Sequence, residues 1–194
     1  MSSSSSFQES ADSQSVETAR ALRRLYFMRA AFSVCWAILI GLFSAKSAGL
    51  ATALLAFYPI WDVLGTIADI RANRNGASKT PQYLNAAISL ITSIAVIIAL
   101  QKGIPQTLIV FGAWAILTGL IQFILGLSRR KVLSGQWPMI ISGAQSTIAG
   151  VSFIVLAHEP TQGITSLAGY ALFGAFYYLL AGFRLNKTKT VSEA

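Results

Sequence analysis

The stretch LATALLAFYPIWDVLGTIADIRANR, residues 50–74, decides the fold class of this chain. Its first half is an apolar run, and its second half carries Asp62 and Asp69 before a basic end at Arg71 and Arg74. A helix of about 20 apolar residues crosses the roughly 30 Å hydrocarbon layer of a bilayer. The stretch therefore predicts a membrane-spanning helix that carries two carboxylates in its second half.

The rest of the chain has a composition that fits the same environment. Of its 194 residues, 54% are hydrophobic and 11% are charged, whereas about 25% of the residues of a soluble domain are charged. Long apolar runs occupy residues 27–45, 49–70, 82–101, 107–127, 137–157 and 164–183. They predict an all-α integral membrane protein with six transmembrane helices in one bundle.

The basic residues indicate how these helices are oriented. With the N-terminus inside, 13 of the 15 Lys and Arg residues lie on the inner side, and Lys46 and Lys102 lie outside. Because cytoplasmic connections carry an excess of Lys and Arg, we expect both termini to be cytoplasmic. The charges lie in short clusters and form no continuous face, so the net charge of +8 does not indicate a nucleic-acid partner.

The predicted membrane domain covers residues 27–185 and divides into three tandem helical hairpins. These hairpin repeats span about residues 27–74, 81–131 and 137–185. Residues 1–15 are polar and Ser-rich, which predicts a disordered tail. Residues 16–28 form either a basic interfacial segment or a plain extension of the first spanning helix. Residues 186–194 are expected to be a cytoplasmic tail.

Small and polar residues recur at about every fourth position of the odd-numbered runs. Such stripes let helix backbones approach in lipid, within one bundle or across a homo-oligomer face, and they can also line a pore. We favour packing inside the bundle. The candidate packing residues are Ser33, Ala37, Gly41, Ser89, Ser93, Ser142, Ser146 and Gly150.

Aromatic residues of the even-numbered runs support the idea of a repeat. Trp61, Trp114 and Tyr170 align when the chain is shifted by 53 and then 56 residues. A period on this scale is typical of a quasi-symmetric array. We therefore expect a six-helix bundle with pseudo-threefold character.

Asp62 is the residue that fits least well with a lipid environment. It lies about 20 Å into a helix that spans roughly 30 Å of hydrocarbon, where an acid costs several kcal/mol unless it is paired, hydrated or protonated. Arg29, just inside the first run, is its natural partner in a structural ion pair. The alternative is a proton-titrating or ion-coordinating group beside a helix distortion at Pro59.

Asp69 lies seven residues after Asp62 and therefore on nearly the same helix face. Its place near the inner interface predicts a salt bridge with Arg24 or Arg71. A proton relay from Asp62 through Asp69 is the alternative, although the outer half of the membrane offers no matching acid.

Enzyme, metal and cofactor chemistry find no support in the sequence. The chain has one His and one Cys, no His-Glu-x-x-His motif, no Gly-x-Ser-x-Gly elbow and no Gly-rich phosphate loop. We therefore expect a protein that is not an enzyme, without a metal or cofactor, and the sequence indicates no small-molecule substrate. Its expected partners are the lipid bilayer and, through the small-residue stripes, further copies of the chain.

Several stretches resemble the HdeD-like family of small membrane proteins built from a short repeat of unknown function. They are AFYPIWDVLGTIADIR, FGAWAILTGLIQFIL, QWPMIISGAQSTIAG and LAGYALFGAFYYLLAG, and the resemblance covers residues 27–185. It implies six membrane helices, a multi-pass location in the bacterial inner (plasma) membrane and a link to acid or envelope stress. It implies no catalytic or binding residues.

Two functions follow from these observations. The first is a non-enzymatic bundle with a structural or interaction role. The second is a protein through which protons or small solutes permeate, with Asp62 as the titrating group. In the second case Asp62 must lie on a path that water can reach, whereas in the first it is buried against Arg29.

Overall fold

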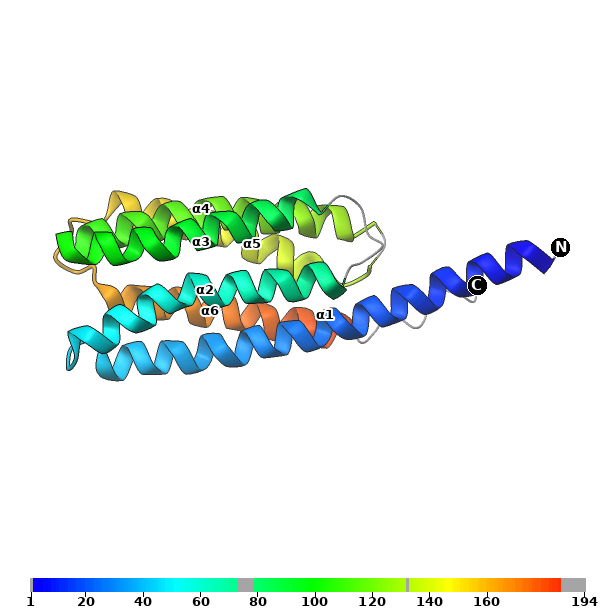
Figure 1. Ribbon diagram of the computed structural model, residues 1–194, viewed down its shortest axis with the longest axis horizontal. Coiled ribbons are helices and arrows are strands. Elements are labelled where there is room, and N and C mark those ends of the chain that lie inside the picture. The colour runs from blue at the N-terminus through cyan, green and yellow to red at the C-terminus, as the bar shows by residue number, and fades with distance from the viewer. Residues whose placement is uncertain (1, 73–78, 132, 186–194) are drawn as a thin grey trace.

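The computed structural model describes residues 2–72, 79–131 and 133–185, with side chains from residue 16 onward. Figure 1 shows a bundle of six long helices lying side by side. All six are long and apolar enough to cross a membrane, which confirms the predicted all-α class and the number of spans. The helices are α1 (Ser2–Phe43), α2 (Ala48–Ala72), α3 (Thr80–Lys102), α4 (Ile104–Arg129), α5 (Trp137–Val155) and α6 (Ile164–Arg184).

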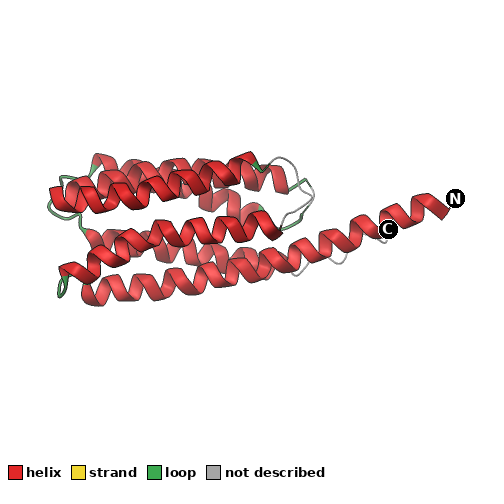
Figure 2. Cartoon of the chain, in the orientation of Figure 1, coloured by secondary structure: helices red, strands yellow, loops and turns green. Residues whose placement is uncertain are grey.

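The connections between the helices are short wherever the structure describes them. Figure 2 shows helices joined by loops and turns, with no strand in the described part of the chain. Pro81, Pro105 and Pro138 lie in the first turns of α3, α4 and α5. Proline is tolerated there because the first helical N–H groups have no partner within the helix. These prolines help to set where three of the six helices begin.

The N-terminal segment differs from the expectation of a disordered tail and a separate interfacial segment. α1 is continuous from Ser2 to Phe43, and its first part projects beyond the bundle (Figure 1). Residues 2–40 contain no Gly or Pro, the two residues that interrupt helices most strongly. Leu22 and Tyr26 are buried against the ends of α5 and α6. Residues 16–28 are therefore the extension of the first spanning helix, and residues 186–194 lie outside the described part.

The six helices form a closed ring. α1 packs against α2 and α6, α3 packs against α2 and α4, and α5 packs against α4 and α6. The first and last helices are thus neighbours, and α1 begins at the same end of the bundle at which α6 ends (Figure 1). A ring of six helices leaves its axis to be filled by side chains.

Apolar side chains fill that axis at both ends of the ring. One cluster includes Trp36, Leu55, Leu108, Phe111 and Phe153, near the connections that follow α1, α3 and α5. The other lies at the opposite end, and its members are Ala19, Leu22, Leu25, Tyr26, Leu133, Met139, Ala181 and Leu185. In the described part of the chain, one buried apolar cluster therefore lies on each side of the middle of the bundle.

One polar contact recurs between neighbouring helices at the same depth. Ser33 contacts Tyr58 (Oγ to Oη, 3.4 Å), Trp114 donates to Ser89 (2.9 Å), and Ser146 contacts Tyr170 (2.6 Å). The serines lie on α1, α3 and α5, and the aromatic residues lie on α2, α4 and α6. Each contact pairs an odd-numbered helix with the next even-numbered helix, which supports an internal repeat.

Pro59 is accommodated within α2, which stays helical across it and changes direction part-way along its length (Figure 1). Proline lacks the N–H that would bond to the carbonyl four residues earlier. The carbonyl that loses its donor is that of Leu55, and the carbonyls on either side of it accept side-chain donors. Trp36 Nε1 donates to Leu54 O (2.7 Å), and Ser93 Oγ donates to Ala56 O (3.0 Å).

Candidate functional site

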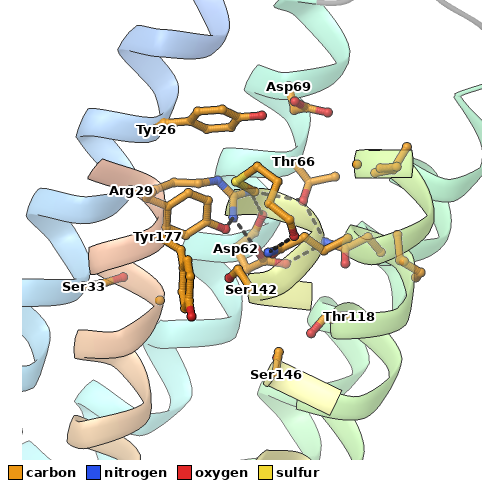
Figure 3. A pocket seen from close by; sticks show the side chains of 18 of the residues that line it. Tyr26, Arg29, Ser33, Asp62, Thr66, Asp69, Thr118, Ser142, Ser146 and Tyr177 are labelled. Atoms are coloured by element: carbon orange, nitrogen blue, oxygen red, sulfur yellow. Dashed lines mark hydrogen bonds and ion pairs between the residues drawn. The ribbon is translucent and has the colours of Figure 1, made fainter. Parts of the chain in front are cut away.

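A cavity of about 180 Å³ lies inside the ring, and side chains from all six helices line it (Figure 3). The lining combines apolar side chains with Ser, Thr, Asn, Gln and Tyr side chains and with four charged ones. The charged side chains are Arg29, Asp62, Asp69 and Arg129. In lipid, such groups are tolerated where they face one another or a water-filled space.

Arg29 and Asp62 form an ion pair in the wall of this cavity. Arg29 Nη1 lies 2.7 Å from Asp62 Oδ1, and the two side chains are 12% and 15% exposed. The other carboxylate oxygen, Oδ2, accepts hydrogen bonds from Asn85 (2.7 Å) and Ser89 (2.8 Å). Both oxygens of Asp62 are therefore held by donors from α1 and α3, as Figure 3 shows for the pair itself.

The surroundings of Arg29 extend this network to two further helices. Its Nη1 donates to the hydroxyl of Tyr178 on α6 (3.0 Å), while Ser89 accepts the indole N–H of Trp114 on α4. The guanidinium lies directly over Gly65, where an added Cβ would be 2.5 Å from Nη2. Gly65 thus leaves the space that the arginine occupies. Five of the six helices meet in one hydrogen-bonded cluster.

Asp69 has a different partner from the one that the sequence suggested. Its carboxylate pairs with Arg129 at the end of α4, and not with Arg24 or Arg71. Asp69 is buried and faces the cavity, whereas Arg24 and Arg71 are exposed on the outside of their helices. Asp62 and Asp69 share one face of α2, so both carboxylates turn toward the cavity.

The end of the cavity near Arg129 contains buried polar atoms without a protein partner in the described part of the chain. They are both amide atoms of Gln136, Oε1 of Gln82 and Nε of Arg129. The two glutamines are each 2% exposed, and all three residues line the cavity. A buried polar group without a partner costs about 1–3 kcal/mol, so these atoms call for water or a ligand.

The candidate packing residues fall into three groups. Ser33, Ser142 and Ser146 line the cavity, and Ala37, Ser89, Ser93 and Gly150 are buried between helices. Gly41 differs, because it is exposed and an added Cβ would meet no atom within 4 Å. It therefore takes no part in packing within this chain. Its position near the exposed end of α1 explains the difference.

Sequence reasoning missed several residues of the cavity. Tyr58 and Tyr178 were not among the candidate site residues, yet their hydroxyls contact Ser33 and Arg29. Gln82, Arg129 and Gln136 lie at the ends of apolar runs, where polar residues normally face water. These three side chains face the cavity only because of the way in which the six helices pack together. The described residues contain no group of three or more His, Cys, Asp or Glu that could hold a metal ion.

Comparison with known families adds one finding. Residues 84–155 match the family of a short repeat of unknown function, DUF308. This match confirms the family resemblance that the sequence suggests. The DUF308 segment runs from the first turns of α3 to the end of α5 and so includes the packing of α4 against α5. The chain matches no curated protein and no solved structure.

Proposed function

We propose that this multi-pass membrane protein is not an enzyme and that it holds a small polar molecule in its central cavity. The observation that carries the proposal is the cavity itself, which side chains of all six helices line and in which buried donors and acceptors have no protein partner in the described part of the chain. A bundle with a purely structural role gains nothing from such atoms, because each lowers its stability.

In this proposal the Arg29–Asp62 pair is structural. Three donors hold the two oxygens of Asp62, so protonation would break an ion pair and disturb the contacts of Asn85 and Ser89. A proton carrier needs a group that exchanges its proton without dismantling its surroundings. The pair instead joins the walls of the cavity, which supports the non-enzymatic bundle that the sequence favours.

Permeation of protons or solutes is the weaker candidate. A pathway must continue from the cavity to both sides of the membrane, but a buried apolar cluster lies near each end of the described bundle. The cluster beyond Tyr58 and Trp114 contains large side chains, including Trp36 and Phe111. These features support a binding pocket without a path across the membrane more than a channel.

The proposed setting is the bacterial inner membrane with both termini in the cytoplasm. The distribution of Lys and Arg supports this orientation. It places Asp69, Gln82 and Gln136 toward the cytoplasmic end of the cavity and the cluster around Trp36 toward the outside. A role in acid or envelope stress rests on the family resemblance.

Thiol labelling tests whether the cavity is polar and hydrated. In a Cys35→Ser background, we expect Ser142→Cys on the cavity wall to react readily with N-ethylmaleimide, because thiolate, the reactive form, needs a polar environment. Ile148→Cys on the same helix is the control, since Ile148 is 68% exposed on the outside of the bundle. We expect it to stay unreactive in a lipid bilayer. Equal inertness at both positions would mean a dry cavity and would refute the proposed function.

A further inference from the structure

The cavity comes close to the surface of the bundle at the side, along α6. Phe173 lines the cavity and is 59% exposed, whereas every other lining residue is buried or half-buried. The neighbouring Gly174 also lines the cavity, and an added Cβ there would meet no atom within 4 Å. Open space therefore adjoins α6 at the point where the cavity lining reaches the lipid-facing surface.

Contacts between α5 and α6 bracket this position. Toward one end, Tyr170 contacts Ser146 and Phe153. Toward the other end, the Arg184 guanidinium lies over the ring of Trp137, 4.7 Å from its centroid. Residues 170 and 184 are about 20 Å apart along a helix. Between them, Phe173, Gly174 and Tyr177 line the cavity from α6, and Ser142 and Gln145 line it from α5.

Among the described residues, the ends of the bundle offer no comparable entrance. Lining residues at the end near Arg129, among them Leu25, Gln82 and Gln136, are buried, and the cluster that includes Leu22 and Leu133 covers them. The opposite end is filled by the cluster around Trp36 and Phe111. A ligand therefore reaches the cavity most directly from the lipid, between α5 and α6.

The charges of the lining select the kind of polar group that fits. The four charged side chains form two opposite pairs, Arg29 with Asp62 and Arg129 with Asp69, so their charges cancel. A charged ligand would bring an uncompensated charge into a site of low dielectric constant, which is costly. The atoms without partners include the donors Gln136 Nε2 and Arg129 Nε and the acceptors Gln136 Oε1 and Gln82 Oε1. A neutral group with several hydroxyls satisfies both kinds.

We propose that the cavity binds the head group of a neutral single-chain amphiphile of the monoacylglycerol type, which enters from the lipid between α5 and α6. The proposal rests on the proposed function and names its ligand class. The glycerol hydroxyls donate to Gln82 and Gln136 and accept from Gln136 and Arg129. The acyl chain passes Phe173 and stays in the bilayer, so only the polar group is transferred from the interface to the cavity.

The test uses a monoacylglycerol that carries a photoreactive diazirine in its acyl chain, with the full chain in phosphatidylcholine nanodiscs. We expect cross-links to concentrate on α5 and α6 near Phe173. Gly174→Leu places a side chain in the open space of the entrance and should weaken probe binding by about tenfold or more, the change that about 1.4 kcal/mol produces. Gly169→Leu is the matched control, because it also has open space but does not line the cavity.

Two further comparisons separate the possible outcomes. Unlabelled monoacylglycerol should compete with the probe, and a fatty acid of the same chain length, ionised at neutral pH, should compete much less. Gln136→Leu, which leaves the entrance intact, should also weaken binding. Equal cross-linking in the Gly174→Leu and Gly169→Leu variants, or equal competition by the fatty acid, would overturn the proposal. If Ser142→Cys still reacts with maleimide in that case, the hydrated cavity stands and only the ligand class is wrong.

Discussion

Asp62→Asn is expected to lower the free energy of unfolding by about 3–5 kcal/mol, as the loss of one partner of a buried ion pair does. The neutral amide leaves the Arg29 guanidinium charged beside a carbonyl, in a wall where both side chains are largely buried. Arg29→Met should cost a similar amount, because it leaves the Asp62 carboxylate without its cation. Equilibrium unfolding in mild detergent, titrated with sodium dodecyl sulfate, measures both changes.

The double variant Arg29→Met/Asp62→Asn tests whether the two residues act as a pair. With both charges removed, no charge is left uncompensated, so the combined loss should be smaller than the sum of the two single losses. The difference, a coupling free energy, is about 0.5–3 kcal/mol for residues in direct contact. Additive losses would show that the two side chains are not coupled in the membrane.

Gly65→Ala is expected to disturb the Arg29–Asp62 ion pair without changing either charge. An added Cβ would lie 2.5 Å from Arg29 Nη2, 2.6 Å from Nε and 2.7 Å from Cζ, so the guanidinium has to move away from Asp62. Overpacking of this kind costs about 1–3 kcal/mol. In the Arg29→Met background the shorter, uncharged side chain should accommodate the methyl group, and most of the cost should disappear.

Gly143→Val is expected to have the second-largest effect, a loss of about 3 kcal/mol or more, at the upper end of overpacking costs. An added Cβ at Gly143 would lie 2.6 Å from the backbone nitrogen of Phe123 and 2.7 Å from the carbonyl oxygen of Gly119. Backbone atoms cannot turn aside as side chains do, so α4 and α5 would have to separate. The same close approach recurs at Gly112 and Gly150.

Gly41→Val is the matched control for the glycine contact between α4 and α5. Gly41 also lies in a membrane helix, but an added Cβ would meet no atom within 4 Å. Because glycine is the less favourable residue within a helix, stability should stay unchanged or rise slightly. Thermal unfolding of the two variants in detergent gives the comparison. A Gly143→Val variant as stable as the wild type would contradict the packing of α4 against α5.

The sequence was sufficient for the helices and for one pair of charges. Length and hydropathy alone determine the six spans, because a bilayer sets the length of an apolar helix. Arg29 and Asp62 could be matched since each is costly in lipid without the other. Arg129 could not be matched to Asp69 in this way, because a basic residue at the end of a span has several partners within reach, including interfacial water.

The repeat illustrates how a correct pattern can be placed in the wrong register. In the sequence, offsets of 56 and 53 residues align Ser33 with Ser89 and Ser142, and offsets of 53 and 56 residues align Trp61 with Trp114 and Tyr170. In the structure the repeated contacts are made by Tyr58 and Ser146, and not by Trp61 and Ser142. Each residue that makes the contact lies about one helical turn from the residue that the alignment selected. Residues three or four positions apart share a helix face, so a stripe of similar residues does not by itself determine the register.

The cavity could not be predicted, because no single helix contains it. Its polar lining is spread over all six helices as isolated Ser, Thr, Asn, Gln and Tyr residues, each of which is equally suited to bonding a neighbouring helix. Gln82 and Gln136 gave no signal, since polar residues in or beside the first turn of a membrane helix normally face water. Their burial follows from the closure of the ring by α1 and α6.

Proton flux into proteoliposomes tests most directly whether the cavity is a pocket without a path across the membrane and whether Asp62 is a structural residue. The measurement compares wild type, Asp62→Asn and empty liposomes after the external pH is lowered, with a protonophore added at the end to show that the vesicles are sealed. Buried apolar clusters lie near both ends of the bundle, and three donors hold the Asp62 carboxylate. We therefore predict that liposomes with the wild-type protein take up protons no faster than empty liposomes. Flux through the wild type that Asp62→Asn abolishes would contradict this account and make Asp62 the working residue of a permeation pathway.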